Sequence, residues 1–346
     1  MGDRVVGLDI GSSAIRAVEV EGADRSRPVV TRYAELALPE GTVQNGEVVD
    51  ASTLANYLKR LWSGSGFRTK DVVLGVGNSR VLARELSVAR MSRERLRESL
   101  PFQVQDLLPV PAGEALLDFY AISEGTGEQG PVYNGLLVAA VKAPVLTAVR
   151  AVQSAGLVPV DVDFIPFAIS RLYGGALGST GAHALLHIGS STTTVVMMIG
   201  RVPQFVRIIP SGGNDLTRAI AARLEIPLRE AEQLKRLVGM TAAGVTPAQR
   251  PGLEAIYELV NEVLASVRDT IAYFVNARAS ISVEHIILSG GGSQLTGFAP
   301  AVAEALRTPV GIAEPFSTVT LARGVRGAGD PNGMSVALGL ALGSRS

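Results

Sequence analysis

The string Ile-Gly-Ser-Ser occurs twice in this chain, at residues 10–13 and 188–191, and it limits the possible folds more than any other feature. Each copy stands between two mostly apolar or β-branched runs, VGLDIGSSAIRAVEVEG in the first half and ALLHIGSSTTTVVMMIG in the second. An apolar run, a glycine-serine turn and a second apolar run predict a β-hairpin. We therefore expect the same kind of hairpin once in each half of the chain.

The two predicted turns have a composition that suits phosphate binding. Backbone N–H groups converge at such a turn, and glycine lets the backbone approach a phosphate oxygen closely. Taken alone, each turn is better explained as a plain hairpin. Because the turn is repeated in matched strand context, we favour two loops that hold a polyphosphate from both sides.

The composition excludes several classes of protein. The chain has 346 residues, 47% of them hydrophobic, which suits a soluble globular protein of two or more domains. Lys plus Arg and Asp plus Glu both number 32, so the net charge does not favour nucleic acid or an anionic membrane as the main partner. The lack of cysteine excludes disulfides and thiolate metal sites and suits the cytosol. Neither a signal peptide nor an apolar run of membrane-spanning length is visible, so we expect any membrane association to be indirect.

Two further glycine turns precede predicted helices. Residues 211–215 read SGGND and predict a helix start capped by Asn214 or Asp215, and residues 289–295 read SGGGSQL after a buried strand. Bare glycine backbone at a helix N-terminus can meet phosphate or ribose oxygens. Many α/β proteins have such turns, so each is weak support by itself.

A helix predicted after Pro227 carries Glu232 and Lys235, which share a face because they are three residues apart. Alone, this pair is best explained as a surface ion pair. The alternative is a carboxylate that accepts hydrogen bonds from ribose hydroxyls, beside a cation that lies over the base.

Residues 80–161 have the pattern of a compact α+β unit inserted into a larger fold. Within it, a helix begins after Ser92, and Pro101 should kink or split that helix. Outside it, residues 53–63 predict a helix capped by Ser52. Residues 334–342 predict a final helix of small and aliphatic residues that packs closely at a domain junction.

Two glycine hairpins, a Gly-Gly helix start, an Ala-Glu-x-x-Lys helix, a Ser-Gly-Gly-Gly turn and a small-residue final helix follow in this order. The order resembles that of the actin, Hsp70 and sugar-kinase superfamily over nearly the whole chain. The resemblance implies an α/β, actin-like ATPase fold with two α/β domains flanking a nucleotide cleft, and with the α+β unit inserted. We assign residues 1–79, 162–180 and 333–346 to the first domain (1A), 80–161 to the inserted 1C-like subdomain, and 181–332 to the second domain (2A and 2B).

The resemblance also implies a site for ATP and Mg²⁺. Residues 11–13 and 189–191 would be the phosphate loops, Glu232 and Lys235 would face ribose and adenine, and residues 290–294 would cover the base. Asp9 would orient the hydrated magnesium, because this ion prefers carboxylate oxygen and water. The full predicted cofactor-binding set is Asp9, Gly11, Ser12, Ser13, Arg16, Gly189, Ser190, Ser191, Thr192, Gly212, Gly213, Asn214, Glu232, Lys235, Gly290, Gly291, Gly292 and Gln294.

The inserted unit resembles that of the bacterial FtsA and PilM families, and the strings VGLDIGSSAIRAVEV, PFQVQDLLPVP and VDVDFIPFAISRL favour PilM, an actin-like family of type IV pilus assembly. FtsA also has a C-terminal amphipathic membrane helix, whereas this chain ends at Ser346, four residues past the final predicted helix. The PilM resemblance implies that the N-terminal cytoplasmic tail of the inner-membrane protein PilN binds beside the inserted subdomain, and it implies links to the pilus assembly motor. An FtsA-like division protein and a filament-forming bacterial actin homologue are the alternatives.

Two departures from the superfamily pattern concern hydrolysis. His187 stands where the second hairpin commonly bears an aspartate, and imidazole is a poor magnesium ligand. It either hydrogen-bonds a phosphate oxygen or is a packed strand residue. Residues 164–172 read FIPFAISRL, without a Gln, Glu or Asp to orient an attacking water. We identify no catalytic residue, and we expect ATP to be a structural or conformational ligand with slow or absent hydrolysis.

Overall fold

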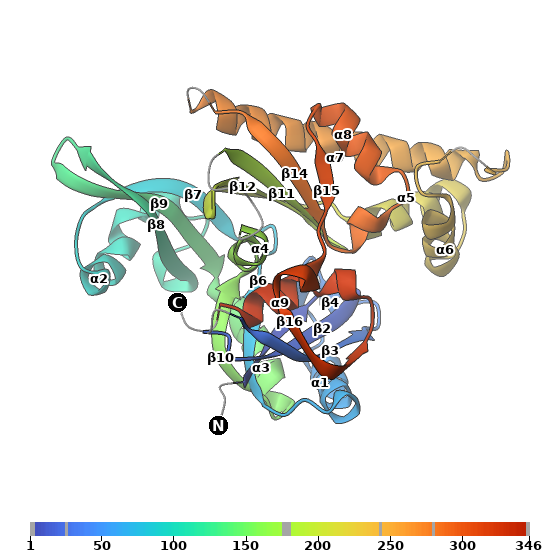
Figure 1. Ribbon diagram of the computed structural model, residues 1–346, viewed down its shortest axis with the longest axis horizontal. Helices are drawn as coiled ribbons and strands as arrows, with labels where there is room; N and C mark the ends of the chain where they lie inside the picture. The colour runs from blue at the N-terminus through green and yellow to red at the C-terminus, as the bar shows by residue number, and fades with distance from the viewer. Residues whose placement is uncertain (1–3, 25–26, 175–180, 242–243, 279–280, 344–346) are drawn as a thin grey trace.

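The first glycine hairpin lies in the middle of a six-stranded sheet in the computed structural model of the chain, which describes residues 4–24, 27–174, 181–241, 244–278 and 281–343 (Figure 1). Strands β1 (Arg4–Ile10) and β2 (Ala14–Glu21) pair antiparallel. The strand order is β10-β6-β1-β2-β3-β16. The outer strands are β3 (Val29–Ala37), β6 (Asp71–Val76), β10 (Val158–Phe164) and β16 (Thr320–Ala328).

The second glycine hairpin has the same place in a five-stranded sheet of order β13-β12-β11-β14-β15. Its strands are β11 (Ala182–Ile188), β12 (Thr193–Ile199), β13 (Val202–Ile209), β14 (Val283–Ser289) and β15 (Val310–Ile312). In both sheets the first hairpin strand pairs parallel with a later strand, β6 or β14. The predicted repetition of the hairpin is therefore confirmed.

Helices separate the two sheets and cover their outer faces (Figure 1). Helices α4 (Ile165–Gly174) and α9 (Ser335–Ala341) lie between the sheets, where their apolar side chains share one core with both. The helices on the outer faces are α1 (Ala51–Ser65) and α3 (Lys142–Ser154) on the first sheet, and α5 (Gly213–Leu224), α7 (Arg250–Asn276) and α8 (Phe298–Leu306) on the second. None of the helices within the described ranges has the length and apolar character needed to cross a membrane.

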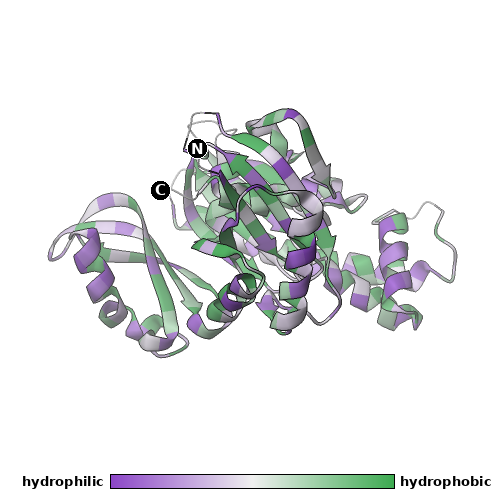
Figure 2. Ribbon diagram, turned by 90° about the horizontal axis from the view of Figure 1, so that it is seen from below, coloured by the Kyte–Doolittle hydropathy of each residue, from purple (hydrophilic) through white to green (hydrophobic). Residues whose placement is uncertain are grey.

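Three antiparallel strands form a separate small sheet that projects from the rest (Figures 1 and 2). They are β7 (Leu82–Ala89), β9 (Gly130–Val141) and β8 (Ala115–Gly127), in this spatial order. Helix α2 (Arg93–Gln103) packs on them and is capped by Ser92, as predicted. Pro101 lies inside the helix, which ends two residues later at Gln103, and a short 3₁₀ turn, Gln105–Leu107, follows, so the break comes after the proline and not at it.

The strand pairing moves two of the predicted domain boundaries. Residues 142–161 were assigned to the inserted unit, but α3 packs with α1 and β10 pairs with β6 of the first sheet. Residues 320–332 were assigned to the second domain, but β16 pairs with β3. Both segments join a sheet whose other strands are far away in the sequence, so local composition does not reveal their partners.

Two predicted helix caps are also wrong. Asp50, not Ser52, caps α1, because its carboxylate accepts a hydrogen bond from Thr53 N at 2.9 Å. This hydrogen bond, together with others to the same carboxylate, lowers the pKa of Asp50 to about 2. Helix α5 begins after Gly212, and the Asp215 carboxylate accepts from Gly212 N at 2.8 Å, from inside the helix. In both cases the carboxylate lies three residues from the N–H that it binds.

Candidate functional site

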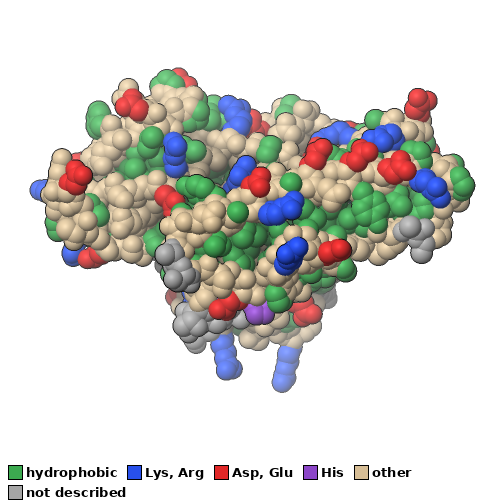
Figure 3. Space-filling model, turned by 90° about the horizontal axis from the view of Figure 1, so that it is seen from above, with side chains coloured by type: hydrophobic (Ala, Val, Ile, Leu, Met, Phe, Trp, Pro, Cys, Tyr) green, Lys and Arg blue, Asp and Glu red, His purple; other side chains and the backbone are tan. Residues whose placement is uncertain are grey.

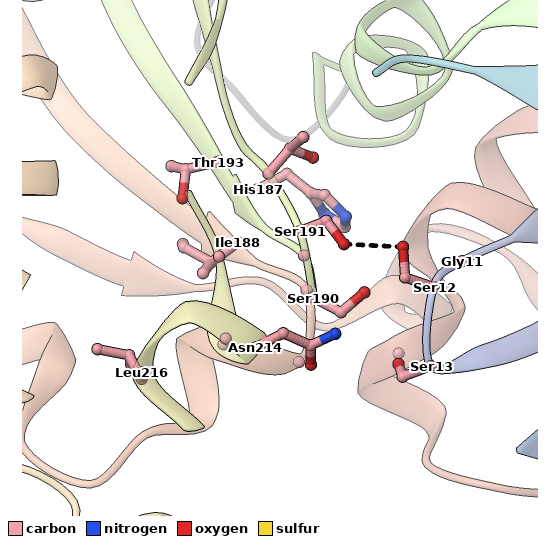
Figure 4. Close-up of a pocket in the computed structure, with 18 of the residues that line it drawn as sticks. Gly11, Ser12, Ser13, His187, Ile188, Ser190, Ser191, Thr193, Asn214 and Leu216 are labelled. Atoms are coloured by element: carbon pink, nitrogen blue, oxygen red, sulfur yellow. Dashed lines mark hydrogen bonds between the residues drawn. The ribbon is translucent and has the colours of Figure 1, made fainter. Parts of the chain in front are cut away.

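The two glycine-serine turns face each other across a cleft of about 860 Å³ between the sheets. Ser191 Oγ donates a hydrogen bond to Ser12 Oγ at 2.7 Å, so the two turns are in direct contact (Figure 4). In the same view the side chains of Ser190 in the second turn and Asn214 in helix α5 (Gly213–Leu224) point toward the first turn. The cleft thus has one matching turn on each side.

The backbone of each turn is organised in the same way. Gly11 N donates to Ala14 O at 3.0 Å, and Gly189 N donates to Thr192 O at 2.8 Å. Within the described residues no group accepts a hydrogen bond from the N–H groups of the serines, which are Ser12, Ser13, Ser190 and Ser191. Backbone donors that converge without an internal acceptor suit the oxygens of a polyphosphate.

The N-terminus of α5 is attached to the second turn. Gly213 N donates to Gly189 O at 3.0 Å, and Asn214 N donates to Ser190 O at 2.8 Å. A Cβ on Gly212 would lie 2.7 Å from Gly189 O, so only glycine allows this approach. The positive end of the helix dipole therefore points at the same place as the turn.

Asp9 is an acidic residue of the cleft lining and stands two residues before the glycine of the first turn. Its register partner on β2 is Arg16, whose guanidinium lies 3.9 Å from the Asp9 carboxylate and 3.1 Å from that of Glu35. Burial raises the pKa of Asp9, and the charge of Arg16 opposes this shift. A buried carboxylate with one distant cation can accommodate a further cation, and magnesium fits this oxygen donor. Arg16, predicted to bind the cofactor, is thus also positioned to orient Asp9.

Glu232 and Lys235 of α6 (Leu228–Val238) form an ion pair of 2.6 Å that is not on the surface, since Lys235 is only 9% exposed. The ammonium also donates to Gly213 O and to Thr217 Oγ1. Although burial raises the pKa of Glu232, its hydrogen bonds with Lys235, Thr217 and Arg236 lower it overall. Glu232 is therefore a fixed carboxylate on the cleft wall, while all three donors of Lys235 are used within the protein.

The turn after β14 packs against the end of β11, beside the second turn. Gly290 has a φ of +82°, and a Cβ there would lie 2.5 Å from Ile188 O. A short 3₁₀ helix, Gly291–Gln294, follows, and the Gln294 amide donates to the Asp330 carboxylate. Asp330 precedes α9, so this bond links the two lobes across the cleft mouth.

His187 occupies the position in β11 that Asp9 occupies in β1, two residues before the turn glycine. Its Nδ1 lies 3.1 Å from Ser289 Oγ on β14. Burial, with a further contribution from the charge of Arg16, lowers the pKa of His187 to about 4. The side chain is therefore a neutral imidazole at pH 7.

The depressed pKa of His187 predicts an acid-sensitive stability. An unfolded histidine has a pKa of about 6.5, so the unfolded state takes up the proton first and the native state loses stability as the pH falls from 6.5 toward 4. We expect the free energy of unfolding to fall by about 2 kcal/mol more in the wild type than in His187→Asn between pH 7 and pH 4.5. Urea unfolding of both proteins at the two pH values measures this difference. Equal losses would show that His187 titrates normally.

The structure brings every residue of the predicted cofactor-binding set to the lining of this one cleft. That these residues bind a nucleotide remains a prediction. Among the polar residues of the lining that the sequence reasoning missed are Glu35, Thr217 and Asp330. Thr217 stands four residues after Gly213, so helical periodicity could have placed it on the same face of the helix. Glu35 and Asp330 stand in no recognisable motif.

Comparison with known proteins gives consistent results. A family model described as type IV pilus assembly protein PilM matches residues 7–345. A solved PilM-PilN type IV pilus biogenesis complex is similar, with a TM-score of 0.84 and 28% identity over 99% of this chain and 98% of that one. MreB5 of Spiroplasma citri bound to AMPPNP has a TM-score of 0.53 and 12% identity over 97% of this chain and 94% of its own, a likeness of fold. FtsA of Pseudomonas aeruginosa, a cell division protein, is 25% identical over 94% of this chain and 86% of its own length. The predicted actin-like fold is confirmed.

Proposed function

The chain belongs to the PilM family of type IV pilus assembly proteins, and we propose that it is a cytoplasmic, ATP-binding member of the assembly platform that binds the N-terminal cytoplasmic tail of PilN. ATP with Mg²⁺ would occupy the cleft as a structural or conformational ligand. The protein would reach the inner face of the cytoplasmic membrane through PilN and would contact the pilus assembly motor.

The observation that carries ATP binding is the pair of facing turns with serine N–H groups that no described residue accepts from. The triphosphate would lie between Ser12 and Ser191, and its oxygens would replace the hydroxyl contact that these two side chains make. The N-terminus of α5 adds the positive end of its helix dipole at the second turn, while its Gly213 and Asn214 N–H groups already donate to that turn. Two sets of free backbone donors and a helix dipole aimed at one point favour a ligand with several anionic oxygens.

The remaining polar groups of the cleft would contact the metal ion and the ribose of the bound nucleotide. Asp9 would hold the hydrated Mg²⁺, which neutralises phosphate charge when bound. Glu232 would accept a hydrogen bond from a ribose hydroxyl through Oε1, because this oxygen accepts only from Arg236 while Oε2 accepts from both Lys235 and Thr217. Lys235 would fix the carboxylate of Glu232 and the N-terminus of α5 rather than bind the base directly.

Slow or absent hydrolysis is consistent with the side chains around the cleft. Helix α4 carries no Gln, Glu or Asp, and its residue on the cleft lining is Ile165. His187 is neutral and already has Ser289 as a hydrogen-bonding partner. Neither group can orient an attacking water as a carboxylate or amide does.

The proposed partner rests on the similarity to the PilM-PilN complex. We place the PilN tail beside the projecting three-stranded sheet of β7, β9 and β8. An exposed apolar residue, Phe102, lies on α2 of that unit and is 82% exposed. An exposed aromatic side chain of this kind is typical of a protein-binding surface.

A peptide-capture experiment tests this proposal. The N-terminal cytoplasmic peptide of PilN from the same genome, carrying a photo-reactive group, should cross-link to residues 82–141 of the purified protein in the presence of ATP and Mg²⁺. A peptide of the same composition in scrambled order is the control.

Capture of a tubulin-like division protein, without capture of the PilN peptide, would contradict the proposal. That outcome would support the FtsA-like alternative, which is consistent with the 25% identity to Pseudomonas aeruginosa FtsA. The filament-forming alternative has no specific observation in its favour.

A further inference from the structure

Three side chains that can bind a metal lie together in the second sheet, away from the cleft. His183 on β11 and Glu284 and His285 on β14 each offer one ligand atom, and these atoms lie within 4.8 Å of one another. His183 is at the start of β11, whereas the Gly189 turn follows its end. Six residues of extended chain, roughly 20 Å, therefore separate this cluster from the turn.

The strand register explains how the three side chains meet. β11 and β14 pair in parallel with Ala182 opposite Val283 and His183 opposite His285, so Glu284 is an extra residue on β14. A bulge of this kind redirects a side chain that regular alternation would place on the other face. Gly181 leaves the necessary space, because a Cβ there would lie 2.3 Å from the Glu284 carboxylate.

His183 is the residue that points to a ligand. It is only 3% exposed, and neither of its ring nitrogens has a hydrogen-bonding partner among the described residues. Its closest ring neighbour is His285, with the two ring centroids 6.0 Å apart. A buried polar group without a partner is costly and uncommon in native proteins. An ion shared with Glu284 and His285 would give the His183 imidazole the partner that it lacks.

We propose that His183, Glu284 and His285 bind one divalent transition-metal ion, with Zn²⁺ as the best match. Two imidazole nitrogens and one carboxylate oxygen are a common zinc ligand set that leaves a fourth position for water. Bonds of about 2.0–2.1 Å in tetrahedral geometry place ligand atoms about 3.3 Å apart, so small side-chain rotations complete the site.

The surroundings of the cluster give the ion access from solvent. Glu284 and His285 are both exposed, while His183 lies beneath them. Figure 3 shows acidic and basic side chains interspersed over the face of the molecule seen from above. The ion would join the starts of β11 and β14, whose far ends carry the second phosphate turn and the Gly290 turn.

Zinc titration of the untagged full-length protein, stripped with a chelator, tests this site. Calorimetry should show one Zn²⁺ bound per chain, and Co²⁺ should give the visible absorption of a tetrahedral site. His285→Gln and Glu284→Gln should weaken the affinity at least about 100-fold, because loss of a direct ligand exceeds the 10–100-fold effect of an outer-shell change. Both residues are exposed, so the fold should survive these changes.

His187→Asn is the matched control, because His187 is the one histidine of the sequence that is not part of the cluster. It should leave the zinc affinity unchanged. The proposal is overturned if the wild type binds no stoichiometric zinc or if His285→Gln binds it equally well. It is also overturned if the binding survives His285→Gln but is lost in Asp9→Asn, which would place the ion in the cleft.

Discussion

Asp9→Asn should weaken the binding of ATP about 30-fold when Mg²⁺ is present, and it should leave the binding of metal-free ATP unchanged or tighter. The reason is that the Asp9 carboxylate would accept charge-assisted hydrogen bonds from the hydrated ion, each worth roughly 1.5–3 kcal/mol, and about 1.4 kcal/mol corresponds to a factor of ten. Without the ion the same buried carboxylate repels the triphosphate, and asparagine removes this repulsion while keeping the shape. Calorimetric titrations with ATP in excess Mg²⁺ and in excess chelator measure both effects.

Asp71→Asn is the control for this experiment, because Asp71 is an exposed aspartate on β6 of the same sheet, outside the cleft. It should bind ATP as the wild type does under both conditions. Equal affinities of Asp9→Asn and the wild type in Mg²⁺ would remove Asp9 from the metal site. Phosphate release from the wild type should be very slow or absent; steady, rapid release that Asp9→Asn abolishes would contradict this expectation.

Gly7→Ala should destabilise the protein by about 3 kcal/mol, the upper range for forcing additional volume into a packed interior. Helix α9 crosses β1 at this glycine, and a Cβ there would lie 1.8 Å from Ala337 O and 2.6 Å from Ala341 N. These are backbone atoms of a helix that is fully buried between the two sheets, so no side-chain rotation relieves the contact. The free energy of unfolding in urea measures the loss.

Gly64→Ala makes the same chemical change with the opposite expected sign. Gly64 lies inside α1, and an added Cβ meets nothing within 4 Å. Alanine in this helix should therefore stabilise the protein by about 0.5–1 kcal/mol through its lower backbone entropy. A Gly7→Ala protein as stable as the wild type would mean that α9 can move away from β1 at little cost.

The close packing of α9 illustrates which parts of the fold the sequence predicts. The small residues of this last helix indicated that it packs closely on another element. They did not identify Gly7, more than 300 residues earlier in the chain, as the residue that it contacts. The same holds for residues 142–161 and 320–332, which were placed in the wrong units because their strands pair with distant partners.

The sequence by itself determined both glycine hairpins and the turns before α5 and after β14. These features are local, since alternation of apolar residues and the position of glycine report directly on strands and turns. Only the tertiary structure decided that Arg16 joins Asp9 to Glu35 and that Gln294 meets Asp330. It also brought His183 to Glu284 and His285. The physical reason is that these contacts depend on strand register and on the packing of two lobes, and a shift of one residue in register would turn each side chain to the other face of its sheet.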